Sequence, residues 1–211
     1  MAKDSGAGLR ESKKHETWRT LHACALELVD ERGYDDVSVE EIAAAARVSK
    51  STLFNYFASK EALLFDPGPG ECGRWQTLAD ERPADEPLWV SVREIIRGRI
   101  AQNAPTLVIQ RRILGAAPHL AQSTKAAGER FQQFVQDWVD ARTQSNPVDP
   151  LCRALLVNTA FAVLRTAYLQ WQPGDDAEHF LRLLDAAFGE IEAGVLDLPR
   201  PRTGSASDDR R

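Results

Sequence analysis

Residues 47–60 collect side chains suited to binding a nucleic acid. Arg47, Lys50 and Lys60 are basic, and no acidic residue lies between them. Basic side chains neutralise phosphates, while hydroxyl and amide groups reach base edges in the grooves of DNA. The residues we expect to contact DNA are Ser38, Arg47, Ser49, Lys50, Ser51, Thr52, Phe54, Asn55, Tyr56 and Lys60.

Two short helices are expected to position these side chains. Ser38 followed by Glu41 fits a capping box, and Ser49 is the next expected N-cap. Leu53 and Phe57 then form an inward apolar pair one helical turn apart, with Phe54 beside them. Two capped helices with a tight turn between them are typical of a helix-turn-helix, which places one helix in the major groove. The alternative is a helical hairpin packed inside a core.

Residues 17–64 resemble the DNA-binding domain of the TetR family of bacterial repressors. The resemblance rests on residues 25–28, 31–34, 38–43, 48–57 and 59–63. It implies an all-α fold, with an N-terminal three-helix helix-turn-helix domain and a C-terminal helical bundle for ligand binding and dimerisation. It also implies a homodimer formed by the last two helices, which binds double-stranded DNA at a pseudo-palindromic operator.

The chain departs from the family pattern at two positions. Arg47 stands where the family usually has a turn glycine, and Phe54 stands where tyrosine is commonest. Arginine is strained there if φ is positive, although its charge adds a candidate phosphate contact. Phe54 lacks the hydroxyl that a tyrosine would offer to DNA.

Composition argues against a protein that coats DNA without specificity. The chain has 211 residues and a net charge of −5, and 43% of its residues are hydrophobic. A small basic edge on an acidic body suits a dimer that reads short half-sites. No apolar run is long enough to span a membrane, and the first 15 residues do not read as a secretion signal. Together with three cysteines of no metal spacing, these features predict a cytoplasmic protein.

The expected organisation has four parts. A disordered arm spans 1–15, the DNA-binding domain 16–64, the ligand-binding and dimerisation domain 65–197, and a disordered tail 198–211. The first helix is expected from about residue 17 to 32, and Ser59 should cap a fourth. Prolines then separate five expected helices, 88–102, 105–116, 119–143, 150–172 and 175–194, while 66–87 is the least regular stretch. Cys24 and Cys152 are expected in the core, and Cys72 in a loop, where a thiol sensor is the less favoured interpretation.

Several polar residues fall on apolar helix faces of the body. Asn158 and Arg165 share one face, while Arg93, Arg97 and Arg112 lie in other apolar segments. A buried arginine needs an anionic partner, which can be an internal carboxylate, a residue across a dimer, or an acidic ligand. The candidate ligand-binding residues are Trp89, Arg93, Arg112, Phe134, Trp138, Asn158, Phe161, Arg165 and Tyr168.

The C-terminal half is more loosely similar to a TetR subgroup that binds acyl-CoA-like ligands, on residues 111–114, 117–120 and 168–171. The resemblance implies a small-molecule effector that is bulky, partly apolar and partly acidic. No catalytic constellation stands out, and His15, His22, His119 and His179 show no metal-ligand spacing, so we expect neither an enzyme nor a cofactor. The alternatives are an effector-independent repressor or architectural protein, and, less favoured, an activator.

Overall fold

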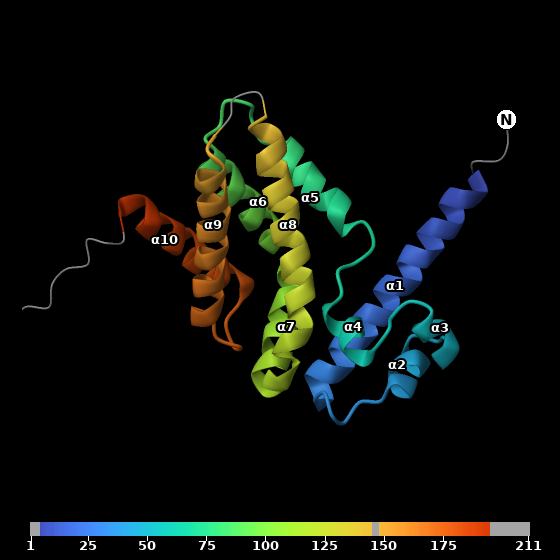
Figure 1. Ribbon diagram of the computed structural model, residues 1–211. Helices are drawn as coiled ribbons and strands as arrows, with labels where there is room; N and C mark the ends of the chain where they lie inside the picture. Colours follow the sequence, from blue (N-terminus) through green and yellow to red (C-terminus); the bar gives the residue numbers. More distant parts are fainter. Residues whose placement is uncertain (1–4, 145–147, 195–211) are drawn as a thin grey trace, which may run out of the picture.

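The computed structural model describes residues 5–144 and 148–194, and every regular element in these ranges is a helix (Figure 1). The expected 198–211 tail and residues 1–4 of the expected arm lie outside the described residues. The elements are α1 (Ser5–Arg32), α2 (Val39–Ala45), α3 (Lys50–Phe54), α4 (Lys60–Phe65), α5 (Glu71–Asp80), α6 (Leu88–Gln102), α7 (Ala104–Ala116), the 3-10 helix η1 (Pro118–Thr124), α8 (Lys125–Arg142), α9 (Pro150–Gln170) and α10 (Ala177–Ala193). The all-α prediction is confirmed.

The N-terminal helices begin and end where their capping residues predict. Ser38 accepts a hydrogen bond from the Glu41 N–H at 3.2 Å, and the Glu41 carboxylate accepts one from the Ser38 N–H at 2.8 Å, which completes the capping box. Ser49 caps α3 by accepting the Thr52 N–H, and Ser59 caps α4 by accepting the Ala62 N–H. Gly33 ends α1 with a φ of 92°, a left-handed conformation that glycine adopts without strain.

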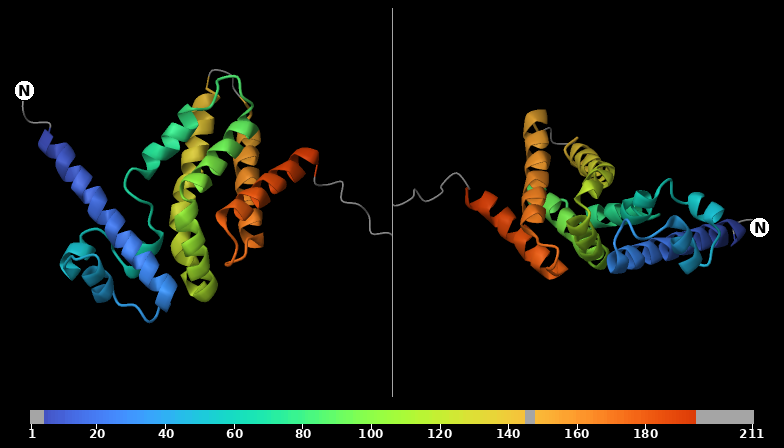
Figure 2. Two further views of the ribbon diagram at one scale, coloured as in Figure 1. Left: turned by 180° about the vertical axis from the view of Figure 1, so that it is seen from behind. Right: turned by 90° about the horizontal axis from the view of Figure 1, so that it is seen from below.

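Two hydrophobic clusters divide the molecule into a head and a body, which lie side by side in Figures 1 and 2. The head cluster is built mainly by α1 to α4, and the body cluster by α5, α6, α8, α9 and α10. The head cluster also includes three buried residues from later in the sequence, Ile113, Ala117 and Leu120. The end of α7 and η1 therefore pack into the core of the head.

The first helix is longer than expected. It begins at Ser5, so residues 5–15 are helical and the prediction of a disordered arm over them is wrong. The segment contains no proline, and it continues the helix whose later turns are anchored by buried Leu21 and Ala25. The hydroxyl of Thr17 donates to the Lys13 carbonyl at 3.0 Å across the expected boundary.

The irregular stretch 66–87 contains a helix that the sequence did not reveal. α5 follows the Pro-Gly segment and buries Trp75 and Ala79 in the body cluster. The expected helix 119–143 is divided instead into η1 and α8. The other body helices lie within two residues of their predicted bounds.

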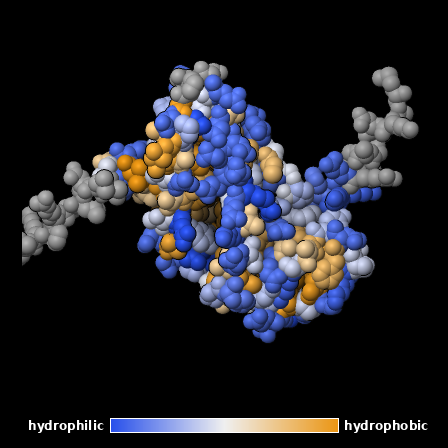
Figure 3. All heavy atoms as spheres, viewed as in Figure 1, coloured by the Kyte–Doolittle hydropathy of each residue, from blue (hydrophilic) through white to orange (hydrophobic). Residues whose placement is uncertain are grey.

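One apolar face of α9 is exposed to solvent. Leu151, Leu155 and Leu169 are exposed by 67%, 56% and 62%, and Asn158 and Cys152 are exposed as well. The expectation that Cys152 is a core residue is therefore wrong, and the face that carries Asn158 does not point into the core. Figure 3 shows hydrophobic residues gathered over this part of the surface.

None of the helices in the described ranges combines the length and apolar character that crossing a bilayer requires.

Candidate functional site

The turn between α2 and α3 is tight and strained. The Arg47 N–H donates to the Ala44 carbonyl at 3.0 Å, and the Val48 N–H donates to the Ala43 carbonyl at 2.9 Å. Arg47 has a φ of 55°, the sole positive φ among the described non-glycine residues. A side chain in this left-handed region costs about 1–3 kcal/mol. The strain anticipated for an arginine at this position is therefore present, and its side chain is exposed.

One residue of α3, Leu53, faces the core, and most of the others are exposed. Leu53 is fully buried and Phe57 is 2% exposed, which confirms the inward pair. Phe54, which the sequence placed beside them, is 44% exposed and points away from the core. The outward surface therefore offers an aromatic ring among polar groups.

Hydroxyl groups at the start of α3 form a small network. The Ser49 Oγ accepts the Thr52 N–H at 3.1 Å and lies 2.9 Å from the Ser51 Oγ and 2.8 Å from the Thr52 Oγ1. Hydroxyls can rotate to donate or accept, so Ser51 and Thr52 can exchange these contacts for DNA atoms. Asn55, at the C-cap of α3, has an exposed side chain.

The lysine on α3 is held by an intramolecular ion pair. Lys50 Nζ lies 2.5 Å from Glu40 Oε1 and 5.9 Å from the centre of the Phe54 ring. The hydrogen bond from Lys50 lowers the pKa of Glu40. Both side chains are more than half exposed, so the pair is screened by solvent and weak. A phosphate can replace Glu40 at little cost.

The lysine at the start of α4, Lys60, is partly enclosed. Lys60 donates to the Tyr34 carbonyl, and its Nζ lies 3.8 Å from the centre of the Tyr34 ring. Burial lowers the pKa of Lys60, and neighbouring carboxylates, Asp35 first, oppose that shift. The Tyr34 hydroxyl donates to Glu61. An ammonium has three N–H donors, so Lys60 keeps donors for a phosphate while it anchors α4 to the end of α1.

Two cavities adjoin the contact between head and body. The junction cavity, of about 470 Å³, lies between α1, the α4–α5 connection, α6 and α7. The body cavity, of about 440 Å³, is bounded by α6 to α9 together with Phe65 and Phe180, and it opens at the hollow beside α8 in Figure 3. Both volumes are typical of small-molecule sites. Phe65, Arg99, Leu107, Gln110 and Ala127 line both, so the two cavities adjoin.

Three of the nine expected ligand-binding residues lie together at the body cavity: Phe161, Arg165 and Tyr168. Arg112 instead pairs with Asp30 of the head. Phe134 packs near Trp75, and the Trp138 ring lies under the Arg142 guanidinium at 5.0 Å. Asn158, which is exposed, accepts a hydrogen bond from Gln132 at 3.0 Å.

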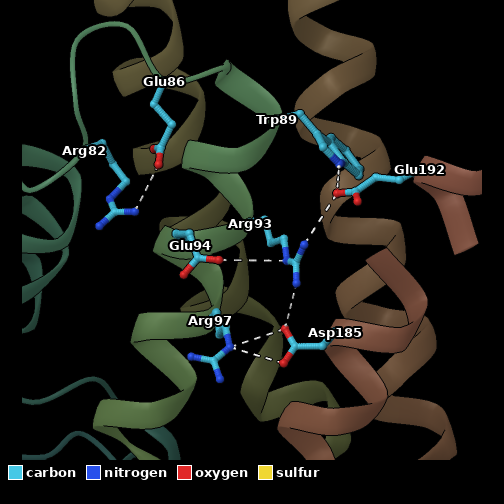
Figure 4. Close-up of polar contacts among 8 residues, drawn as sticks. All are labelled: Arg82, Glu86, Trp89, Arg93, Glu94, Arg97, Asp185 and Glu192. Carbon is cyan, nitrogen blue, oxygen red and sulfur yellow. Dashed lines mark hydrogen bonds and ion pairs between the residues drawn. The ribbon is translucent and has the colours of Figure 1, made fainter. Parts of the chain in front are cut away.

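The expected ligand anchors on α6 are occupied by carboxylates of α10 (Figure 4). Arg93 lies 3.4 Å from Asp185 and 3.6 Å from Glu192, and Arg97 lies 3.3 Å from Asp185. The Trp89 indole N–H donates to Glu192 at 3.0 Å. Of the partners considered for these arginines, the internal carboxylate is the one observed. Trp89 and Arg93 therefore join α6 to α10 and line neither cavity.

Sequence reasoning missed Arg99, the arginine in the wall that the two cavities share. Its side chain is 19% exposed, and burial lowers the pKa of its guanidinium, with Glu71 opposing the shift. Helical spacing could have found it, because Arg99 follows Val92, Ile95 and Ile96 on the buried stripe of α6. Arg93 and Arg97 lie beside that stripe.

Comparisons with known proteins agree with this arrangement. Residues 22–66 match the family model described as bacterial regulatory proteins, tetR family, and residues 86–196 match the model described as the MftR C-terminal domain. The chain is 25% identical over 198 residues to the putative mycofactocin biosynthesis transcriptional regulator MftR of Mycobacterium tuberculosis, covering 92% of this chain and 98% of that protein.

Solved structures share the fold. A putative TetR-family regulator of Syntrophomonas wolfei superposes with a TM-score of 0.57 at 18% identity, covering 87% of this chain and 98% of the other. FadR of Thermus thermophilus, a TetR-family repressor solved with lauroyl-CoA, superposes with a TM-score of 0.52 at 21% identity, covering 89% and 99%. With a capped helix-turn-helix in its head and family models matching both halves, the chain is a DNA-binding transcriptional regulator of the TetR family.

Proposed function

We propose that this regulator is a repressor that binds a pseudo-palindromic operator as a homodimer and leaves it when a small molecule binds. The observation that carries the proposal is the placement of α7 and η1. Ile113 of α7, Leu120 of η1 and Ala117 between them pack in the head core. Leu107, Gln110 and Leu114 of α7 line the body cavity. A molecule in that cavity therefore contacts the helix that supports the head.

The DNA contacts that we propose are those of the helix-turn-helix and its flanks. Lys50, Arg47 and Lys60 would bind phosphates, and Ser51 and Asn55 would read base edges. The remaining contacts fall on Ser38, Ser49, Thr52, Phe54 and Tyr56. Such contacts belong to one half-site, and a two-fold dimer would read the second half-site about 34–36 Å away or at a multiple of that spacing.

The exposed apolar face of α9 supports dimerisation. Leu151, Leu155 and Leu169 lie on it, and exposed leucines at helical spacing are typical of a protein interface. We propose that this face and α10 pack against a second copy. Replacing Leu155 with Asp should give a monomer in sedimentation analysis and abolish operator binding, whereas Thr77→Asp, at an exposed position of α5, should leave both unchanged. A dimeric Leu155→Asp protein would contradict this interface.

The effector that we propose is a bulky amphiphile with an acidic group. The apolar walls of the body cavity support this class, as does the lauroyl-CoA held by the Thermus FadR, which shares the fold. The ligand would favour one arrangement of the body over another, and its differential affinity for the two arrangements sets how far DNA binding falls. Like its operator, the protein would act in the cytoplasm.

A genomic footprint with purified protein tests the proposal most directly. We expect short pseudo-palindromic sites beside promoters, one of them near the regulator's own gene, and loss of these sites when an effector encoded by the neighbouring pathway is added. Raised transcription in a deletion strain would establish repression. Sites that persist with every candidate ligand would favour an effector-independent repressor, and lowered transcription would favour an activator.

A further inference from the structure

The wall between the two cavities holds a poorly satisfied buried ion pair. Arg99 Nη2 lies 3.6 Å from Glu71 Oε1, and the two side chains are only 19% and 7% exposed. Charge-assisted hydrogen bonds normally lie at about 2.7–2.9 Å. Because burying two charges is costly unless their geometry is good, this pair recovers little of its desolvation free energy.

Arg99 also has unused hydrogen-bonding capacity. Its buried Nε finds no acceptor among the residues that the structure describes, and neither does the buried Nε1 of Trp75. The Arg99 guanidinium lies 5.8 Å from the centre of the Trp75 ring and 4.6 Å from that of Phe131. A buried donor without an acceptor is costly, so this part of the core is short of acceptors.

The position of Arg99 suits a ligand that is charged at one end and apolar along its length. Phe131, Phe161, Leu164 and Phe180 line the body cavity on one side of it. The charged end would lie against the guanidinium, whose planar fork matches a carboxylate or a phosphate. The apolar part would then lie against the phenylalanine rings.

We propose that Arg99 is the anchor for the anionic group of the effector, and that this group replaces Glu71 as the partner of Arg99. The inference rests on the proposed function, since it names the residue that recognises the acidic end of the ligand. The shared chemistry is one anionic group, carboxylate or phosphate, on an apolar chain.

Release of Glu71 has a direct route to the head. Glu71 is the first residue of α5, and its N–H donates to the Gly68 carbonyl at 3.1 Å in the connection from α4. That connection lies against α1, because a Cβ at Gly68 would be 3.1 Å from the Trp18 ring. A change at Glu71 therefore acts on the segment that links the end of α4 to α1.

Calorimetric titration with dodecanoate, dodecyl phosphate and neutral dodecanol tests the anchor. We expect the protein to bind at least one of the two anions about ten- to hundredfold more tightly than dodecanol. Arg99→Met should lose this preference and Arg99→Lys should keep part of it. Glu71→Gln should bind the anion more tightly, because the internal competitor is gone. Arg97→Met is the matched control on α6, outside both cavities, and should bind like the unmodified protein.

The two Arg99 variants and Glu71→Gln are expected to shift affinity in opposite directions, which general destabilisation cannot produce. Melting curves followed by circular dichroism show whether each variant folds, and Arg99→Lys serves if Arg99→Met does not. The proposal is overturned if neither anion binds saturably, if Arg99→Met keeps the preference, or if Glu71→Gln weakens it. It is likewise overturned if Arg165→Met, at the exposed side of the same cavity, abolishes the preference while Arg99→Met does not.

Operator binding measured in parallel separates this inference from the proposed function. An anion that binds through Arg99 but leaves operator affinity unchanged would support the anchor and contradict effector-controlled release. A ligand that releases the operator equally well from the Arg99→Met protein would support the proposed function and overturn the anchor.

Discussion

Arg112 on α7 binds Asp30 on α1 through two hydrogen bonds, Nε to Oδ1 at 2.9 Å and Nη2 to Oδ2 at 2.5 Å. The pair joins the helix that lines the body cavity to the last turns of the first helix of the head. Bidentate arginine–carboxylate pairs fix orientation as well as distance. Sequence reasoning assigned Arg112 to the ligand, whereas the structure assigns it to the contact between head and body.

Breaking this pair should weaken the coupling between ligand and DNA more than it weakens the fold. Arg112 is 43% exposed, so we expect Arg112→Gln to change the free energy of unfolding by less than about 1 kcal/mol. The fall in operator affinity that the ligand causes should become smaller. Denaturant melts and operator titrations with and without ligand measure the two effects. Asp30→Asn should have the same two effects as Arg112→Gln. The double variant should differ little from either single variant, because both substitutions break the same pair. Additive effects of the two substitutions would contradict the role given to the pair.

The turn residue Arg47 should show a conflict between stability and DNA binding. Arg47→Gly removes the strain at φ 55° and should stabilise the protein by about 1 kcal/mol. It also removes a charge that we place near a phosphate, so operator affinity should fall and the slope of log K against log salt should become shallower by about 1. Arg47→Ala is the control, since it keeps the strained backbone and lacks the charge. If the salt slope is unchanged in both variants, Arg47 does not contact a phosphate.

Local signals in the sequence located the parts of the head well. Ser38, Ser49 and Ser59 cap the helices that they were expected to cap, and Gly33 ends α1 in a left-handed conformation that suits glycine. Each of these features depends on hydrogen bonds or backbone angles within a few residues of the chain. Such interactions are present in the sequence pattern itself.

Partners far apart in the chain were less predictable. The pattern showed that Arg93 needs an anion, but only the packing of α10 on α6 shows that Asp185 and Glu192 supply it. Asn158 lies on an apolar face of α9 that is exposed. An apolar helix face can pack against the core of its own chain or against another copy, and the pattern of a single helix does not distinguish the two. Arg99 lies on the buried stripe of α6, and only the packing of α5 on α6 shows that Glu71 is its partner.

The α3 lysine should contribute to affinity through charge alone. Lys50→Ala should weaken binding to all DNA sequences and make the salt slope shallower by about 1, since one phosphate contact is lost. Stability should hardly change, because the Lys50–Glu40 pair is more than half exposed on both sides. Fluorescence anisotropy at several salt concentrations measures the slope. Lys50→Arg keeps the charge and should keep the salt slope of the unmodified protein. An unchanged slope in Lys50→Ala would show that Lys50 does not contact a phosphate.

Asn55 should affect which operator is preferred rather than how salt acts. Its exposed amide lies at the end of α3, where it can pair with a base edge. One such contact discriminates against a wrong base by about 1–3 kcal/mol. We expect a selection from random DNA to give Asn55→Ala a relaxed preference at one position of each half-site, with the salt slope unchanged. Phe54→Ala, which removes an exposed ring without hydrogen-bonding groups, should lower affinity without that loss of preference, and the same consensus for Asn55→Ala would exclude direct readout by Asn55.

His22 should make the stability of the head depend on pH. Its Nδ1 lies 2.6 Å from the Leu63 carbonyl oxygen, and its ring stacks on Trp18 at 4.7 Å, so it joins α1 to α4. Burial lowers the pKa of His22 below its ordinary value of 6.5, and the hydrogen bond to Leu63 opposes that shift. The unfolded chain therefore takes up a proton at a higher pH than the folded one.

Stability should accordingly be full above about pH 7.5 and fall as the pH drops below about 6.5 toward the lowered pKa of the folded state. His22→Asn, whose amide can donate to the same carbonyl, should have a melting temperature that changes less with pH over that window. His119→Gln, at an exposed position, is the control and should keep the dependence of the unmodified protein. If His22→Asn loses stability on acidification as steeply as the unmodified protein does, groups other than His22 govern the response and the link between α1 and α4 does not titrate.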